Sequence, residues 1–188
     1  MATEQVMASA LGETFARYIE QMRAAWARGQ DATLPARAQA LLEALLRTAP
    51  ADEPWLAQLL RERPAARALY RDPDYGFIQM GHFHPAGHSN APHDHGPCWV
   101  LYGVYQGAVE ITTYRRTDDG SVPERASLAV QETARLTPGT VRPYLPGDIH
   151  AVRTVDPAGA VVLRFLSADL ERVERYRYDL ATGARYRI

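Results

Sequence analysis

Residues 81–96 read Gly-His-Phe-His-Pro-Ala-Gly-His-Ser-Asn-Ala-Pro-His-Asp-His-Gly, and residues 145–150 read Leu-Pro-Gly-Asp-Ile-His. These two stretches contain all six histidines of the chain. His93 and His95 are two positions apart, so on an extended segment their side chains lie on one face, close enough to bind a single metal ion. Together with the distant His150 they form the set from which a β-barrel builds a three-imidazole site. Imidazoles suit iron, zinc, copper and nickel, and such a site leaves coordination positions open for substrate and for oxygen or water.

The residues around these histidines indicate short β-strands. Segments rich in aromatic and β-branched residues alternate with turn signals such as Thr117-Asp-Asp-Gly120 and Pro146-Gly147, and Gly107 marks a tight connection. Many short strands at roughly regular spacing predict a sandwich or barrel rather than a βαβ fold. The expected strands cover residues 77–83, 99–105, 108–114, 142–145, 149–155 and 161–166.

The first third of the chain is expected to be helical. Apolar residues recur at steps of three and four between Leu11 and Trp26, and a second set follows between Ala38 and Leu46. A third helix is predicted to begin near Asp52, a plausible N-cap. Because no linker or repeat interrupts the sequence, we expect one domain over residues 1–188, with a helical segment over 1–70 and a β-barrel over 75–188.

Composition excludes several classes of function. The net charge of −1 provides no general attraction to nucleic acid or anionic lipid, and no apolar run is long enough to span a membrane. The single cysteine, Cys98, and the absence of a secretory signal fit a cytoplasmic protein. All 21 basic residues are arginine, so a cation that holds an anionic substrate must be an arginine or a metal.

The spacing of glycines and histidines resembles that of the cupin superfamily. Gly87, His93-x-His95 and Gly107 match its first motif, and Gly139 with Gly147-x-x-His150 matches its second. The resemblance implies a mainly β fold, the cupin double-stranded β-helix (jelly-roll) barrel, here with an N-terminal helical segment.

One departure narrows the resemblance. The position of the usual cupin glutamate ligand is Val100, which cannot bind a metal. Three histidines without a carboxylate are similar to the thiol dioxygenases, the group of cysteine dioxygenase and 3-mercaptopropionate dioxygenase. The stretches 70–77, 92–99 and 146–150 are similar too, and the likeness covers about residues 60 to 167. The resemblance implies an Fe(II) cofactor that binds a thiolate and O2 and yields a sulfinate. Nickel or zinc is expected as an alternative in purified protein.

The surroundings of the metal differ from that group. Its Ser-x-His-x-Tyr strand corresponds to residues 162–166, which place Arg164 at the histidine and Leu166 at the tyrosine. The arginine that holds the substrate carboxylate in cysteine dioxygenases falls at about Ala66, with Arg67 adjacent. Arg164 and Arg67 are therefore the candidate substrate-binding residues. For Arg164, an ion pair with Asp or Glu is the competing interpretation, because a buried guanidinium needs an anionic partner.

Other candidates surround the expected ligands. Tyr102 shares a strand face with Val100 and is the candidate catalytic residue, either hydrogen-bonding substrate or oxygen or simply packed in the barrel. His82, His84 and Trp99 are expected to support the metal ligands. Whether His82, His84 and His88 face the cavity stays open, and Cys98 is expected to be a structural residue.

The sequence thus predicts a non-haem Fe(II) dioxygenase that oxidises a small thiol carboxylate to a sulfinate. Alternatives are another metal-dependent cupin enzyme (a diketone-cleaving dioxygenase, a lyase or an isomerase) and a non-enzymatic cupin that binds small molecules. The expected partners are a small anionic substrate and O2, with no nucleic acid and no membrane. Whether the chain forms a homodimer stays open.

Overall fold

The computed structural model describes residues 11–188. Three helices come first, as the apolar periodicity predicts: α2 (Glu13–Ala27), α3 (Leu34–Thr48) and α4 (Pro54–Glu62). The N-cap position of helix α4 is Glu53 rather than the expected Asp52. The Glu53 side chain makes no capping bond to the helix backbone and instead accepts hydrogen bonds from Thr14 N (2.6 Å) and Trp55 Nε1 (2.7 Å). No helix within residues 11–188 has the length and apolar character needed to cross a membrane.

The strands form two main sheets. The five-stranded sheet has the order β1-β2-β8-β3-β6, and the three-stranded sheet has the order β5-β4-β7. The strands of the first are β1 (Arg67–Arg71), β2 (Ile78–His84), β3 (Val100–Gln106), β6 (Val141–Tyr144) and β8 (Ala160–Leu166). Those of the second are β4 (Val109–Arg116), β5 (Leu128–Leu136) and β7 (Ile149–Thr154). A separate hairpin near the end of the chain consists of β9 (Tyr176–Tyr178) and β10 (Arg185–Arg187).

The segment around His93 completes the second sheet. His93 pairs with His150 of β7 on one side and with Arg177 of β9 on the other. Without the added strand β1, the facing layers are therefore β2-β8-β3-β6 and (92–94)-β7-β4-β5, which is the strand order of a double-stranded β-helix. The predicted fold class, a mainly β jelly roll with an N-terminal helical segment, is confirmed.

The helical segment is shorter than expected. Residues 67–70 fall within the expected helical segment, yet together with residue 71 they form β1 and pair antiparallel with β2. The register shifts at Leu69, beyond which Tyr70 and Arg71 pair with β2, and Leu69 and Tyr70 pack against the helices. The β-structure thus begins before residue 75.

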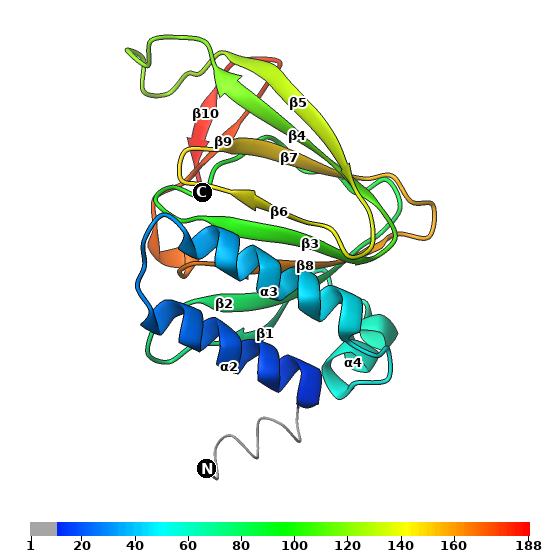
Figure 1. Cartoon of the computed structure of the whole chain (residues 1–188). Coiled ribbons are helices and arrows are strands. Elements are labelled where there is room, and N and C mark those ends of the chain that lie inside the picture. The colour runs from blue at the N-terminus through cyan, green and yellow to red at the C-terminus, as the bar shows by residue number, and fades with distance from the viewer. Residues whose placement is uncertain (1–10) are drawn as a thin grey trace.

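The large sheet separates two apolar cores. Figure 1 shows α2 and α3 lying across its outer face. On β8, Leu163 and Phe165 point toward the helices, whereas Val162 and Leu166 point between the sheets. Because side chains alternate along a strand, the intervening Arg164 faces the interior of the barrel as well. Cys98 is buried in the same interior core, which fits the expected structural role.

Gly107 forms the tight connection between β3 and β4. Its φ is +79°, and a Cβ atom there would lie 2.2 Å from the Gly159 carbonyl oxygen. We expect Gly107→Ala to lower the free energy of unfolding by about 3 kcal/mol, since left-handed strain and a backbone clash combine. Gly87 has φ +72°, but a Cβ atom there would meet no other described atom within 4 Å. Gly87→Ala should therefore lower the free energy of unfolding by only about 1 kcal/mol. Urea unfolding measures the free energy of unfolding of both variants, and equal losses in the two would contradict a backbone clash at Gly107.

Candidate metal centre

The structure brings the three predicted metal ligands together. His93 and His150 exchange both backbone hydrogen bonds, N–O 2.9 and 3.0 Å, so their side chains lie on the same face. His95 follows two residues after His93. One ring nitrogen from each of the three lies within 4.8 Å of the others. All three residues are less than a tenth exposed.

The ligand nitrogens are held in the state that binds a metal. Burial is the main cause that lowers the pKa of His93 to about 4 and that of His95 to about 2, and it holds the pKa of His150 well below its usual value. All three imidazoles are therefore neutral at pH 7. His93 Nδ1 lies 3.0 Å from the Ala91 carbonyl oxygen, which can only accept, so Nδ1 carries the proton and Nε2 has the lone pair.

The donor set fits a divalent transition ion. Both ring nitrogens of His95 and both of His150 are buried without a hydrogen-bond partner in the described part of the chain. Buried polar atoms without partners are costly and rare, so these nitrogens point to a ligand among them. Neutral imidazoles are also the form that a metal requires. The residues present therefore fit a three-histidine metal site.

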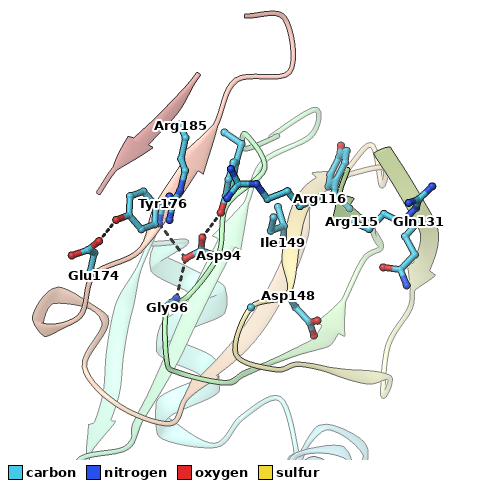
Figure 2. A pocket seen from close by; sticks show the side chains of 13 residues that line it. Asp94, Gly96, Arg115, Arg116, Gln131, Asp148, Ile149, Glu174, Tyr176 and Arg185 are labelled. Atoms are coloured by element: carbon cyan, nitrogen blue, oxygen red, sulfur yellow. Dashed lines mark hydrogen bonds between the residues drawn. The ribbon is translucent and has the colours of Figure 1, made fainter. Parts of the chain in front are cut away.

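No carboxylate joins the three histidines within residues 11–188. Asp94 alternates with His93 and His95 and faces the other way, where it accepts hydrogen bonds from Tyr178 Oη (2.6 Å) and Gly96 N (3.0 Å). Figure 2 shows Asp94 in a separate surface pocket of about 480 Å³, which no histidine lines. Val100 occupies the interior position that the sequence comparison gave to a glutamate.

Tyr102 and Arg164 lie beside the triad. The Tyr102 ring centroid is 5.1 Å from that of His150, and the Tyr102 hydroxyl accepts a long hydrogen bond, 3.4 Å, from Arg164 Nη1. The charge of Arg164 contributes to the lowered pKa of all three histidines, which agrees with a position facing them. Arg164 Nε is buried without a partner, and no carboxylate of residues 11–188 forms an ion pair with this guanidinium within 4.0 Å. The competing interpretation, a structural ion pair of Arg164, is therefore not what the structure shows.

His82 and His84 also lie inside the barrel. They lie on β2 with ring centroids 5.6 Å apart, and His88 is 4.5 Å from His84. Burial is the main cause that lowers the pKa of His82 to about 3 and that of His84 to about 4. His82 Nδ1 lies 2.8 Å from the Ala65 carbonyl oxygen, so its Nε2 bears an unpartnered lone pair.

Two expected residues lie elsewhere. Trp99 stacks on Trp26 and Phe165, with centroids 5.5 and 5.3 Å apart, and so packs on the helix side of the sheet. Its position next to the interior residue Val100 puts it on the opposite strand face. Arg67 forms an ion pair with Glu62 and lies opposite Gly81, where a Cβ atom would touch α4. Neither residue is brought to the three histidines.

Tyr144 and Arg175 were not among the residues expected at the site. The Tyr144 ring centroid is 4.0 Å from that of His150, and its hydroxyl is buried without a hydrogen-bond partner among residues 11–188. Arg175 contributes to the lowered pKa of His93 and His95. Alternation along residues 142–145 could have marked Tyr144 as an interior residue, whereas only the pairing of β9 with the His93 segment brings Arg175 close.

No family model and no curated protein sequence matches the chain. Similar solved structures include the cupin domain of Cnp3 from Schizosaccharomyces pombe, at 13% identity and a TM-score of 0.44 over 55% of this chain and 60% of that one. KdgF from Halomonas sp. has 18% identity and a TM-score of 0.42 over 57% and 83%. A cupin superfamily protein from Desulfitobacterium hafniense has 19% identity and a TM-score of 0.40 over 55% and 76%. This chain thus covers less than two thirds of the Cnp3 structure. The assignment of the fold rests on the strand order of the two sheets. The similar structures carry no information about a substrate of this chain.

The buried neutral histidines make the metal-free protein sensitive to acid. An unfolded chain binds protons on histidine near pH 6.5, whereas the folded chain resists them until about pH 4 or below. The stabilisation is therefore complete above pH 6.5 and is lost as the pH falls through the range from 6.5 to 4. We expect the free energy of unfolding of metal-free protein to fall by several kcal/mol between pH 7 and pH 5. Thermal unfolding at both values measures this, and an unchanged Tm would contradict it.

Proposed function

We propose that the protein is an Fe(II)-dependent dioxygenase that oxidises a small thiol carboxylate to a sulfinate. The observation that carries the proposal is a buried triad of neutral histidines beside an arginine, with no carboxylate of residues 11–188 joined to either. A bound Fe(II) ion would supply Lewis acidity, redox chemistry and open coordination positions at this site. The overall reaction converts RSH and O2 into RSO2H. Both oxygen atoms enter the product and four electrons leave the sulfur, so no further reductant is needed.

Arg164 is proposed to bind the substrate carboxylate. A planar guanidinium with free donors suits a carboxylate held by two hydrogen bonds. Within residues 11–188 the hydrogen bond of the Arg164 guanidinium is the long one to the Tyr102 hydroxyl. The positive charge of Arg164 lies among imidazoles that stay neutral. The site as a whole therefore favours the binding of an anion. The same field favours the thiolate over the thiol of a bound substrate.

Tyr102 is proposed to orient the substrate or oxygen. Because its hydroxyl accepts from Arg164 Nη1, its own proton is available to donate to a group in the cavity. The apolar side chains of Val100, Val104 and Val162 line the same interior and are fully buried. They exclude water from the space in which these polar groups act.

His82 supports a second candidate function. A buried imidazole with its tautomer fixed by the Ala65 carbonyl presents Nε2 as a base inside the barrel. Proton transfer by such a base belongs to the lyases and isomerases rather than to sulfur oxygenation. A metal-dependent lyase or isomerase on the same three histidines is therefore the alternative to the dioxygenase.

Oxygen consumption tests the proposed function. Metal-free protein is loaded anaerobically with one Fe(II) per chain, mixed with 3-mercaptopropionate or cysteine, and followed with an oxygen electrode. We expect uptake of one O2 per thiol consumed and a sulfinate that carries both atoms of ¹⁸O2 by mass spectrometry. The control is 3-hydroxypropionate, which lacks the sulfur. No uptake with either thiol at full iron loading would contradict the dioxygenase and favour the lyase or isomerase.

A further inference from the structure

Strand β9 places two more arginines on the side of the metal ligands. Tyr178 N donates to the Pro92 carbonyl (2.8 Å), and Asp94 N donates to the Tyr176 carbonyl (3.0 Å). This pairing sets Arg177 opposite His93. Paired residues share a face and alternate residues of a strand return to it, so Arg175 and Arg177 lie on the His93 side. Tyr178 lies on the other face, where its hydroxyl contacts Asp94.

A pocket of about 360 Å³ opens at this place. It is lined by His93, Arg175, Arg177, Ser89 and Asn90, with Ala91 and Ile188 completing it. His93, a candidate metal ligand, therefore forms one wall of this pocket. The charged side chains of the pocket are those of Arg175 and Arg177, and no acidic side chain of residues 11–188 lines it. The pocket lies at the edge of the metal centre, whereas Arg164 approaches the histidines from β8 inside the barrel.

The arginines of this region have no acidic partners in the described chain. No carboxylate oxygen of residues 11–188 lies within 4.0 Å of the guanidinium nitrogens of Arg164, Arg175 or Arg177. Arg175 Nε donates to the Leu170 carbonyl at 3.2 Å, a bond that positions the guanidinium and leaves its terminal nitrogens for other acceptors. Burial and the charges of Arg164 and Arg177 lower the pKa of Arg175, although the more distant carboxylates of Asp94 and Glu171 oppose this shift. Like charges gathered in this way repel one another until an anion binds among them.

We propose that Arg175 and Arg177 bind a second anionic group of the substrate, so that the site takes a thiol bearing two carboxylates. The assignment of a thiol rests on the proposed function, whereas the preference for a dicarboxylate rests on the arginines alone. One carboxylate binds Arg164 within the barrel, and the other binds Arg175 and Arg177 in the pocket beside His93. Mercaptosuccinate is 3-mercaptopropionate with one carboxylate added at the carbon that bears the sulfur, so the two thiols form a matched pair.

The first test uses metal-free protein and ligands without sulfur. Succinate and butyrate have the same number of carbons and differ by one carboxylate. We expect calorimetry at low ionic strength to show succinate binding about tenfold more tightly, the effect of one additional charged contact. The double variant Arg175→Gln/Arg177→Gln should abolish this preference. Arg172→Gln removes a nearby exposed arginine that pairs with Asp169 instead, and it should keep the preference.

The single variant Arg177→Gln guards against misfolding, because Arg177 is exposed and has no described side-chain partner whose loss would disturb the fold. It should lower the succinate preference without lowering Tm. Equal binding of succinate and butyrate, no binding of succinate, or an unchanged preference in the double variant would overturn the proposal.

The second test uses iron-loaded protein and separates this proposal from the proposed function. The KM for mercaptosuccinate should be about tenfold below that for 3-mercaptopropionate, and the double variant should bring the two values together. If neither thiol is oxidised while succinate still binds through Arg175 and Arg177, the dioxygenase fails and the dicarboxylate site stands. If both thiols are oxidised with equal KM, the dioxygenase stands and the dicarboxylate site fails.

Discussion

Replacing Arg164 by methionine is expected to raise the KM for a thiol carboxylate by about 100-fold, the effect of losing a charged pair of hydrogen bonds. Arg164 is the interior cation on β8, between Met80 of β2 and Tyr102 of β3 in the strand register. Methionine keeps an unbranched apolar stem at this position and removes the charged guanidinium. Because the guanidinium has no carboxylate partner in the described chain, its loss should leave Tm unchanged or higher. Steady-state kinetics with 3-mercaptopropionate measures the effect.

The matched control for Arg164 is Arg153→Met. Arg153 lies on β7, is exposed, and pairs with Glu110 at 2.6 Å on the outer surface. Its variant should keep the KM and the metal content of the unaltered protein. A rise in KM of less than threefold for Arg164→Met, with metal content intact, would show that another group binds the carboxylate.

His150→Ala is expected to weaken metal binding by more than about 100-fold and to remove activity. Removing a residue that hydrogen-bonds to a metal ligand lowers the affinity for the metal by 10–100-fold. Removing one of three direct ligands should therefore lower that affinity by more. His150 is fully buried, with ring centroids of His93 and His95 at 4.8 and 5.0 Å. Metal content after dialysis against a weak chelator measures the change.

Two variants control for the loss of a histidine in general. His88→Ala removes a histidine that lies beside His84 and outside the three-histidine cluster, so it should retain one metal per chain. His150→Gln keeps more of the side-chain volume next to Tyr144 and should lose the metal as His150→Ala does. Full metal content in either His150 variant would remove this histidine from the ligand set.

Much of the site follows from alternation along strands. His93 and His95 are correctly placed on one face because the segment is extended, and Arg164 is correctly placed in the barrel because its strand alternates between the two cores. The same rule explains why the expectation for Trp99 was wrong. As the neighbour of Val100 it must face the helices, where Trp26 and Phe165 cover it.

Long-range pairing accounts for what the sequence did not indicate. Strand β5, Leu-Ala-Val-Gln-Glu-Thr-Ala-Arg-Leu, is mostly exposed and carries few β-branched residues, and it is a strand because β4 pairs with it. Strand β1 begins three residues after Pro64 and is a strand because it pairs with β2. Arg175 and Arg177 share a pocket with His93 only because β9 pairs with residues 92–94. Arg67 carried no local signal of its ion pair with Glu62.

Three histidines are expected to hold one metal ion without a carboxylate. Anomalous diffraction at the iron absorption edge tests this ligand set. Crystals of the protein loaded with Fe(II) under anaerobic conditions should give one strong anomalous peak per chain. We expect this peak to lie about 2.1 Å, the length of a metal–imidazole bond, from one ring nitrogen each of His93, His95 and His150. We expect no oxygen ligand from Asp94, whose carboxylate accepts a hydrogen bond from Tyr178 on the other face. An iron peak at any other place, or a carboxylate within bonding distance of it, would rule out a metal centre of three histidines alone.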